Sequence, residues 1–119
     1  MSLRTWLRAN LPRSRYRRLV RMAWAVLCVW HRNDLNRLAS SLGTDKWGEH
    51  WYTQYYQRYF EPLKNKRLNV LVIGIGGYDA PDAGGKSLRM WKAYFRKSQI
   101  NGSDIYDNNN LSERRIDIR

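Results

Sequence analysis

The feature that most constrains this chain is an apolar run that leads directly into a cluster of glycines. Strand-forming residues fill Asn69–Ile73, and Gly74-Ile75-Gly76-Gly77 follows at once. A continuous aliphatic run of this length is typical of a buried strand in a parallel sheet. Glycines directly after such a strand let bare backbone turn closely around a ligand. The sequence therefore predicts an α/β fold with a binding loop at the carboxyl end of this strand.

A second strand is predicted at Gln99–Tyr106, with Asp104 near its tip. The segment between the two strands, from Lys86 to Phe95, has helical spacing, so the two strands should be parallel neighbours. Parallel strands end at the same edge of a sheet, which places Asp104 beside the glycine loop. A glycine loop and a neighbouring carboxylate form half of a nucleoside-binding site.

The N-terminal segment, residues 1–38, differs in composition from the remainder of the chain. The 119 residues carry a net charge of +12, and this segment holds nine arginines against one acid, Asp34. From Arg15 to Arg37 the apolar residues recur at helical spacing, which predicts one amphipathic helix. We therefore divide the chain into a basic helical extension, 1–38, and the N-terminal half of a nucleoside-binding domain, 39–119.

Two uses of this extension are open. It can cover the flank of the domain, or its arginines and tryptophans can make a weak contact with an anionic membrane surface. No DNA- or RNA-binding motif is present, so nucleic acid is not an expected partner. The apolar run Met22–Trp30 is too short to span a bilayer, and we expect a cytoplasmic protein. Cys28, His31 and His50 do not make up a typical zinc site, and we expect no metal ligands in this chain.

Between the extension and the first strand lies a polar turn followed by an aromatic helix. Aromatic residues recur at helical spacing within Glu49–Phe60, and Pro62 follows them. Such a stripe indicates core packing, but packing alone does not account for the polar turn Thr44-Asp45-Lys46. At the other end of the chain, Arg115–Arg119 alternates like the start of a third strand. The order of elements predicts a three-layer α/β/α domain that is truncated and leaves a sheet edge open.

Three ligand chemistries compete for the glycine loop. A dinucleotide fingerprint, G-x-G-x-x-G/A, requires a third small residue where this chain has Asp79. A phosphate-binding P-loop nearly fits Ala80–Ser87, with Lys86 on the phosphates and Ser87 on Mg²⁺. A P-loop leaves its strand directly, however, whereas Gly76-Gly77-Tyr78-Asp79 intervene here, and Asp79 and Asp82 would repel a triphosphate.

The third chemistry is S-adenosylmethionine (SAM), whose sulfonium and amino groups are cationic. A glycine turn with acids nearby suits this cofactor better than it suits ATP. Asp104 is placed to accept hydrogen bonds from both ribose hydroxyls, as a carboxylate at the tip of the neighbouring strand would.

The chain resembles class I SAM-dependent methyltransferases of the macrolide-sugar O-methyltransferase kind over residues 40–119. The motifs that carry this resemblance are the Gly43-Thr44-Asp45-Lys46 turn, the loop that ends in Gly76-Gly77-Tyr78-Asp79, the Ser87–Trp91 helix and Ser103–Tyr106. The resemblance implies a partial Rossmann-like fold and methyl transfer from SAM to a hydroxyl of a sugar or glycosylated small molecule.

The resemblance also implies roles for individual residues. Gly74, Gly76 and Gly77 would form the turn under the methionine part of SAM, with Tyr78 in the same wall. Ser87 would bond the cofactor carboxylate, and Asp104 would hold the ribose. A further group would close over the cofactor from the upstream segment: Thr44, Asp45, Lys46, His50 and Tyr52.

Two departures from the resembled enzymes stand out. These methyltransferases usually carry an acid where this chain has Val72, and that acid helps to order the SAM amino group. Their metal ligands and catalytic base lie beyond the position of residue 119, so a divalent metal such as Mg²⁺ would be bound by residues absent from this chain. We therefore expect a fragment that is inactive by itself and carries the SAM half-site. The sequence does not predict the oligomeric state.

Overall fold

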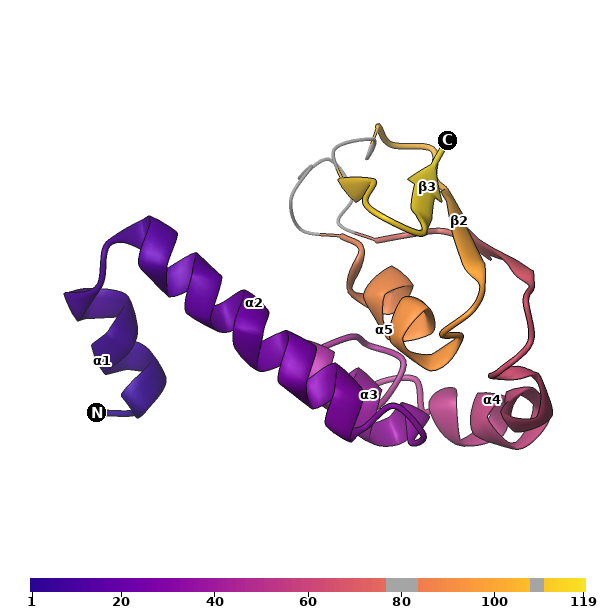
Figure 1. The fold of residues 1–119 in the computed structure, drawn as a ribbon, viewed down its shortest axis with the longest axis horizontal. Helices are drawn as coiled ribbons and strands as arrows, with labels where there is room; N and C mark the ends of the chain where they lie inside the picture. The colour runs from indigo at the N-terminus through magenta and orange to yellow at the C-terminus, as the bar shows by residue number, and fades with distance from the viewer. Residues whose placement is uncertain (77–83, 108–110) are drawn as a thin grey trace.

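The protein is described here by a computed structural model that covers residues 1–76, 84–107 and 111–119. Helices occupy the N-terminal half, and a small parallel sheet occupies the C-terminal half (Figure 1). The elements of the described residues are α1 (Leu3–Asn10), α2 (Arg13–Trp30), α3 (Leu35–Leu42), α4 (Thr53–Phe60), the 3-10 turn η1 (Glu61–Leu63), β1 (Asn69–Ile73), α5 (Lys86–Tyr94), β2 (Gln99–Ser103) and β3 (Ile116–Ile118).

The three strands form a parallel sheet in the order β1-β2-β3. Ile73 lies opposite Ser103 in the β1–β2 register, so both strands end at the same edge. Ile100 of β2 pairs with Ile116 of β3. The prediction of an α/β fold, with strands on either side of an intervening helix and a third strand near the C-terminus, is confirmed. Among the described strands, β1 and β3 form the two outer edges.

The core lies between one face of this sheet and the helices packed on it. Ile100, Ile116 and Ile118 point to this face, where Leu88 and Tyr94 of α5 are also buried. Helices α3 and α4 pack against α5 and against each other, and they supply fully buried Leu35, Leu38 and Thr53. The structure thus has two of the three predicted layers over its described residues.

The prediction that β1 is buried was wrong for one of its faces. Leu71 and Ile73 are 63% and 80% exposed, whereas Val70 and Val72 pack against the core. The reason is that the core lies only on the face toward which Val70 and Val72 point. The aliphatic run therefore marks a strand with one apolar face still open to solvent.

The prediction of one helix over Arg15–Arg37 was also wrong, because α2 ends at Trp30 and α3 begins at Leu35. Asp34 caps α3, its side chain accepting a hydrogen bond from the Arg37 amide at 3.0 Å. Gln57 of α4 accepts from the Leu35 amide at 2.8 Å and donates to the Asn33 carbonyl at 3.1 Å. These bonds favour a turn over a continuous helix.

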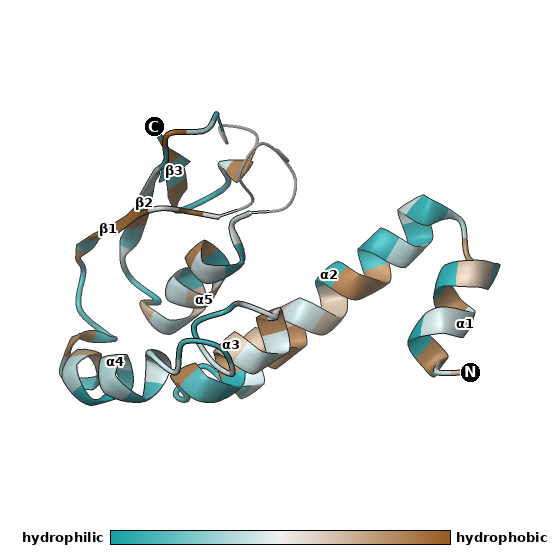
Figure 2. Ribbon diagram, turned by 180° about the vertical axis from the view of Figure 1, so that it is seen from behind, coloured by the Kyte–Doolittle hydropathy of each residue, from teal (hydrophilic) through white to brown (hydrophobic). Residues whose placement is uncertain are grey.

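The first two helices form an arm that extends away from the sheet (Figure 1). Neither α1 nor α2 contains a buried residue. In Figure 2, hydrophilic colour dominates the N-terminal end of α2, and hydrophobic bands follow toward α3. Within the described ranges, no helix is at once long enough and apolar enough to cross a membrane.

Candidate nucleoside-binding site

An open pocket lies at the carboxyl ends of β1 and β2, which is where parallel sheets bind ligands. Its volume is about 490 Å³. The pocket combines two positions of the glycine turn with the segment that follows β2. Its lining residues are Ile73, Gly74, Gly76, Ser103, Asp104, Ile105 and Tyr106.

Asp104 joins the two sides of this pocket. Its Oδ2 accepts a hydrogen bond from the Ile75 amide at 2.7 Å, and its Oδ1 accepts from the Tyr106 amide at 3.2 Å. The bond from Ile75, followed by that from Tyr106, holds the pKa of Asp104 below its usual value. Each carboxylate oxygen has a second lone pair, so Asp104 can also accept hydrogen bonds from the hydroxyl groups of a ligand.

The glycine turn adopts a backbone conformation that other residues rarely take. Gly74 and Gly76 have φ angles of 78° and 84°. The Gly74 amide donates to the Ser103 carbonyl at 2.8 Å, which extends the β1–β2 ladder into the turn. The backbone at Gly84 also lies close to this turn, because a Cβ on Gly84 would be 2.3 Å from the Gly76 carbonyl oxygen.

Two predicted site residues, Gly77 and Tyr78, lie outside the described residues. Ser87 is 5% exposed, within the first turn of α5, and it is not among the residues that line the pocket. The first half of the P-loop candidate, 80–83, also lies outside the described part of the chain. The Lys86 ammonium lies against Gly43, at 3.8 Å from the position of a Cβ there, and lines the groove between α1, α2 and α3.

The five upstream candidates lie together in the segment between α3 and α4. Thr44 is buried, and its hydroxyl accepts from the Lys46 amide at 3.2 Å. Asp45 pairs with the Lys46 ammonium at 3.2 Å and with His50 Nε2 at 3.5 Å. The His50 ring stacks on Tyr52, with centroids 5.2 Å apart. The structure therefore links all five residues in one polar and aromatic cluster.

The Asp45 carboxylate remains ionised within this cluster. Desolvation acts to raise its pKa, but the hydrogen bond and charge of Lys46, together with His50, outweigh it and bring the pKa below the usual value. Each of these partners is a donor or a cation. The segment thus presents a neutralised carboxylate and an aromatic surface rather than a free negative charge.

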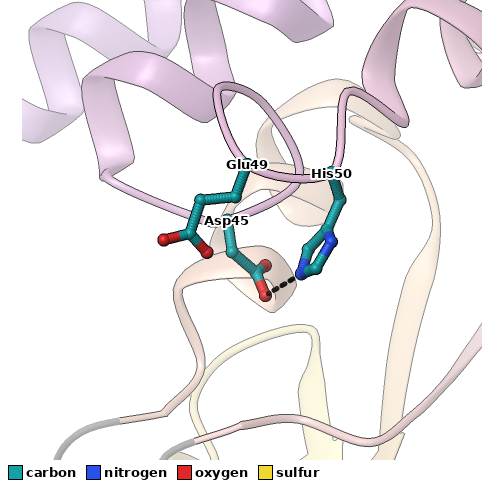
Figure 3. A group of neighbouring side chains, drawn as sticks. All are labelled: Asp45, Glu49 and His50. Atoms are coloured by element: carbon teal, nitrogen blue, oxygen red, sulfur yellow. Dashed lines mark ion pairs between the residues drawn. The ribbon is translucent and has the colours of Figure 1, made fainter.

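The sequence pattern predicts no metal ligands and no role for Glu49. Figure 3 shows Asp45, Glu49 and His50 extending from the same side of one loop. Their ligand atoms lie within 4.8 Å of one another, so they could hold a metal ion. All three side chains are exposed. The Lys46 ammonium already pairs with Asp45 Oδ1 and His50 Nε2 with Oδ2, which argues against a preformed metal site.

Ile105 has no predicted role of its own, although it lines the pocket beside Asp104. Its side chain is 92% exposed, which is unusual for a large aliphatic residue. Its signal in the sequence is its position directly after the strand-end acid, where a side chain borders any ligand held by that acid. Val72 lies on the opposite side of β1 and packs against the core, away from the pocket lining.

The electrostatics of the pocket favour a ligand without an anionic chain. Its described lining holds one carboxylate and no lysine or arginine. A pyrophosphate or triphosphate would meet the Asp104 charge with no basic side chain to offset it. A nucleoside with a neutral or cationic substituent fits this lining.

Comparison with known proteins places the chain beside sugar O-methyltransferases, although no family model matches it. Demethylmacrocin O-methyltransferase of Streptomyces fradiae is 48% identical over 90 residues, 75% of this chain and 23% of the relative. Mycinamicin VI 2''-O-methyltransferase of Micromonospora griseorubida is 46% identical over 90 residues, again 75% and 23%. A rhamnosyl tetracenomycin-C 2'-O-methyltransferase of Streptomyces olivaceus is 49% identical over 79 residues, 66% and 21%.

A solved structure agrees with these relatives. The MycE methyltransferase from the mycinamycin biosynthetic pathway, in complex with Mg, SAH and mycinamycin VI, superimposes with a TM-score of 0.69. It is 46% identical, and the match covers 72% of this chain and 24% of MycE. The chain therefore spans about a quarter of the length of the proteins it matches.

Proposed function

Because the chain is homologous to macrolide-sugar O-methyltransferases, we propose that it supplies the cofactor half-site of a SAM-dependent O-methyltransferase. The acceptor would be a hydroxyl of a sugar or a glycosylated small molecule, as in the names of its relatives. The domain would be residues 39–119, with residues 1–38 as an extension. The half-exposed free thiol of Cys28 is compatible with a cytoplasmic location.

The observation that carries this proposal is the bond between Asp104 and the Ile75 amide at 2.7 Å. It fixes a carboxylate beside the glycine turn, in a pocket whose described lining has no basic residue. Both ribose hydroxyls can donate to the remaining lone pairs of that carboxylate. Ile105 would cover one face of the adenosine, which accounts for its exposure of 92%.

When bound, SAM supplies an electrophilic methyl group on a sulfonium. The residues of this chain would bind and orient the cofactor and hold its methyl group toward the acceptor. Gly74 and Gly76 would admit the methionine portion, with Gly77 and Tyr78 continuing that wall and Ser87 bonding its carboxylate. The cluster of Thr44, Asp45, Lys46, His50 and Tyr52 would close over it.

The acceptor site and catalytic base would be provided by residues outside this chain. MycE was solved with Mg and SAH, and we propose that Mg²⁺ is likewise held outside this chain. The 119-residue chain should therefore bind the cofactor without turnover.

Calorimetric titration of the chain with SAM and S-adenosylhomocysteine tests this function. Asp104→Asn should weaken both affinities by about 100-fold, because the acceptor loses its charge and one of its two oxygens becomes an NH2 group that donates instead of accepting. Asp117→Asn, which removes a carboxylate from β3 where it pairs with Arg119, is the charge-matched control and should bind normally.

A parallel titration with ATP addresses the P-loop alternative. Heat with ATP that disappears in Lys86→Ala, combined with no response to SAM, would overturn the proposal. Equal affinity for S-adenosylhomocysteine in the native chain and in Asp104→Asn would overturn the assigned role of the carboxylate.

A further inference from the structure

Helix α2 carries an apolar stripe that nothing in the described structure covers. The stripe consists of side chains that are 44% to 79% exposed and recur along one side of the helix: Leu19, Met22, Val26, Val29 and Trp30. Spacings of three and four residues place them on one face. A contiguous exposed apolar surface of this kind marks a contact site.

The stripe points away from the body of the protein. A different face of α2 packs inward, where Trp24 and Cys28 contact the core. Val20, Trp24 and Leu27 also line the groove that α2 forms with α1 and α3, and Leu19 of the stripe lies at the edge of this groove. The remainder of the stripe, Met22, Val26, Val29 and Trp30, is therefore not the surface by which α2 attaches to the domain.

The arm is also strongly cationic, and no acid within it balances the charge. Residues 1–33 contain eight arginines and neither Asp nor Glu. The ion pairs among the described residues involve Arg37, Lys46, His50, Lys64, Lys92 and Arg119, and none of the eight. Arg15 and Arg18 are exposed and precede Leu19 and Met22 by four residues, so they continue the stripe by one turn.

We propose that the α1–α2 arm binds the surface of an anionic lipid bilayer. The stripe would enter the boundary between headgroups and acyl chains, with Arg15 and Arg18 on lipid phosphates. Trp30, at 79% exposure, has the amphipathic ring that favours this boundary. This surface lies outside the methyl-transfer site and goes beyond the function proposed above.

Other occupants fit less well. If two arms paired in parallel, the arginines of one copy would face the arginines of the other. If they paired antiparallel, the arginines of one copy would face the apolar residues of the other. In neither arrangement does the arm contribute an acid. A nucleic acid would neutralise the arginines, but it has no use for a stripe of aliphatic side chains. An anionic bilayer meets both the charge and the apolar surface.

Sedimentation of the whole chain with vesicles tests the proposal. Phosphatidylcholine vesicles containing phosphatidylglycerol should bind it, and pure phosphatidylcholine vesicles should not. Arg15→Gln/Arg18→Gln should lower the partition coefficient by about 30-fold. Met22→Gln/Val26→Gln/Val29→Gln should lower it by at least about 100-fold, because the inserted apolar surface is lost.

The matched control is Arg58→Gln/Lys97→Gln, which removes two exposed cations outside the arm and should bind normally. Helical circular dichroism confirms that each variant is folded. Equal loss in the control and in Arg15→Gln/Arg18→Gln would overturn the proposal, because net charge alone would explain binding. A dimer in light scattering that the stripe variant dissociates, or tighter binding to RNA than to anionic vesicles, would overturn it as well.

Discussion

The sheet with its crevice and the N-terminal arm are held together in different ways. In the first region, Tyr94 and Ile100 are fully buried, and the Asp104 carboxylate ties two strand ends together. In the arm, α1 and α2 bury no residue completely. The structure of the sheet and its pocket therefore depends on contacts between segments distant in sequence. The structure of the arm depends on its own helical hydrogen bonds and on one packed face. Substitutions should accordingly lower the free energy of unfolding strongly in the first region and only slightly in the second.

The largest effect is expected from a cavity in the sheet. Ile100 of β2 has no exposed surface, so Ile100→Ala should lower the free energy of unfolding by about 2–5 kcal/mol. Urea denaturation followed by circular dichroism measures this change. A loss under about 1 kcal/mol would mean that the sheet relaxes around the cavity and is less well packed than the described core.

A smaller effect should follow from adding volume beneath the glycine turn. A Cβ on Gly102 would lie 2.8 Å from Ile75 Cδ1 and 3.3 Å from Leu88 Cδ1. Gly102→Val should cost about 1–3 kcal/mol, because Ile75 must move. Since the Ile75 amide donates to Asp104, the same variant should weaken S-adenosylhomocysteine binding. Unchanged affinity would show that the turn and the packing beneath it are independent.

The Asp104 carboxylate should make stability depend on acid pH. Its pKa is lowered in the folded state by the Ile75 amide and then by the Tyr106 amide, so it favours folding while ionised. This contribution is present above the unfolded pKa of about 3.9 and is lost as the pH falls through the folded pKa. Asp104→Asn should melt below the native chain at pH 7, and the gap in melting temperature should close toward pH 3. A constant gap would contradict this linkage.

The smallest effect is expected in the arm. Val26 is 64% exposed, so Val26→Ala should change the free energy of unfolding by about 0.5 kcal/mol or less. Alanine also has the higher helix propensity, which offsets the lost apolar surface. Urea denaturation again measures the change. A cost as large as that of Ile100→Ala would mean that the stripe is buried in a self-associated form, which dilution during the titration would reveal.

Local sequence patterns were sufficient to predict most of the strands and the helix between them. The aliphatic run before Gly74 predicted β1, and helical spacing after Lys86 predicted α5. The break between α2 and α3 was missed, because the residues up to Arg37 continue a helical pattern. The Asp34 cap was a readable signal, but the bonds from Gln57 come from α4 and have no signature near the break.

The position of Asp104 beside the glycine turn was predictable from the sequence, but its hydrogen-bond partners and the position of Glu49 were not. Parallel pairing of β1 and β2 was enough to expect Asp104 near the glycine turn, and the carboxylate does contact that turn. Its role toward a cofactor stays a prediction. The partners of Asp104 could not be predicted, because both are backbone amides whose direction depends on the turn. The grouping of Glu49 with Asp45 and His50 likewise depends on how one loop folds back.

The sequence by itself determined the order of helices and strands, the basic character of the arm and the identity of the acid at the end of β2, since these follow from local periodicity and composition. Tertiary structure decided which sheet face is covered, where the long N-terminal pattern breaks and which atoms Asp104 holds. Those features arise from contacts between segments such as 74–76 and 104–106, which are far apart in the chain and meet only when β1 and β2 pair. Composition records which groups are available, but packing determines which groups meet.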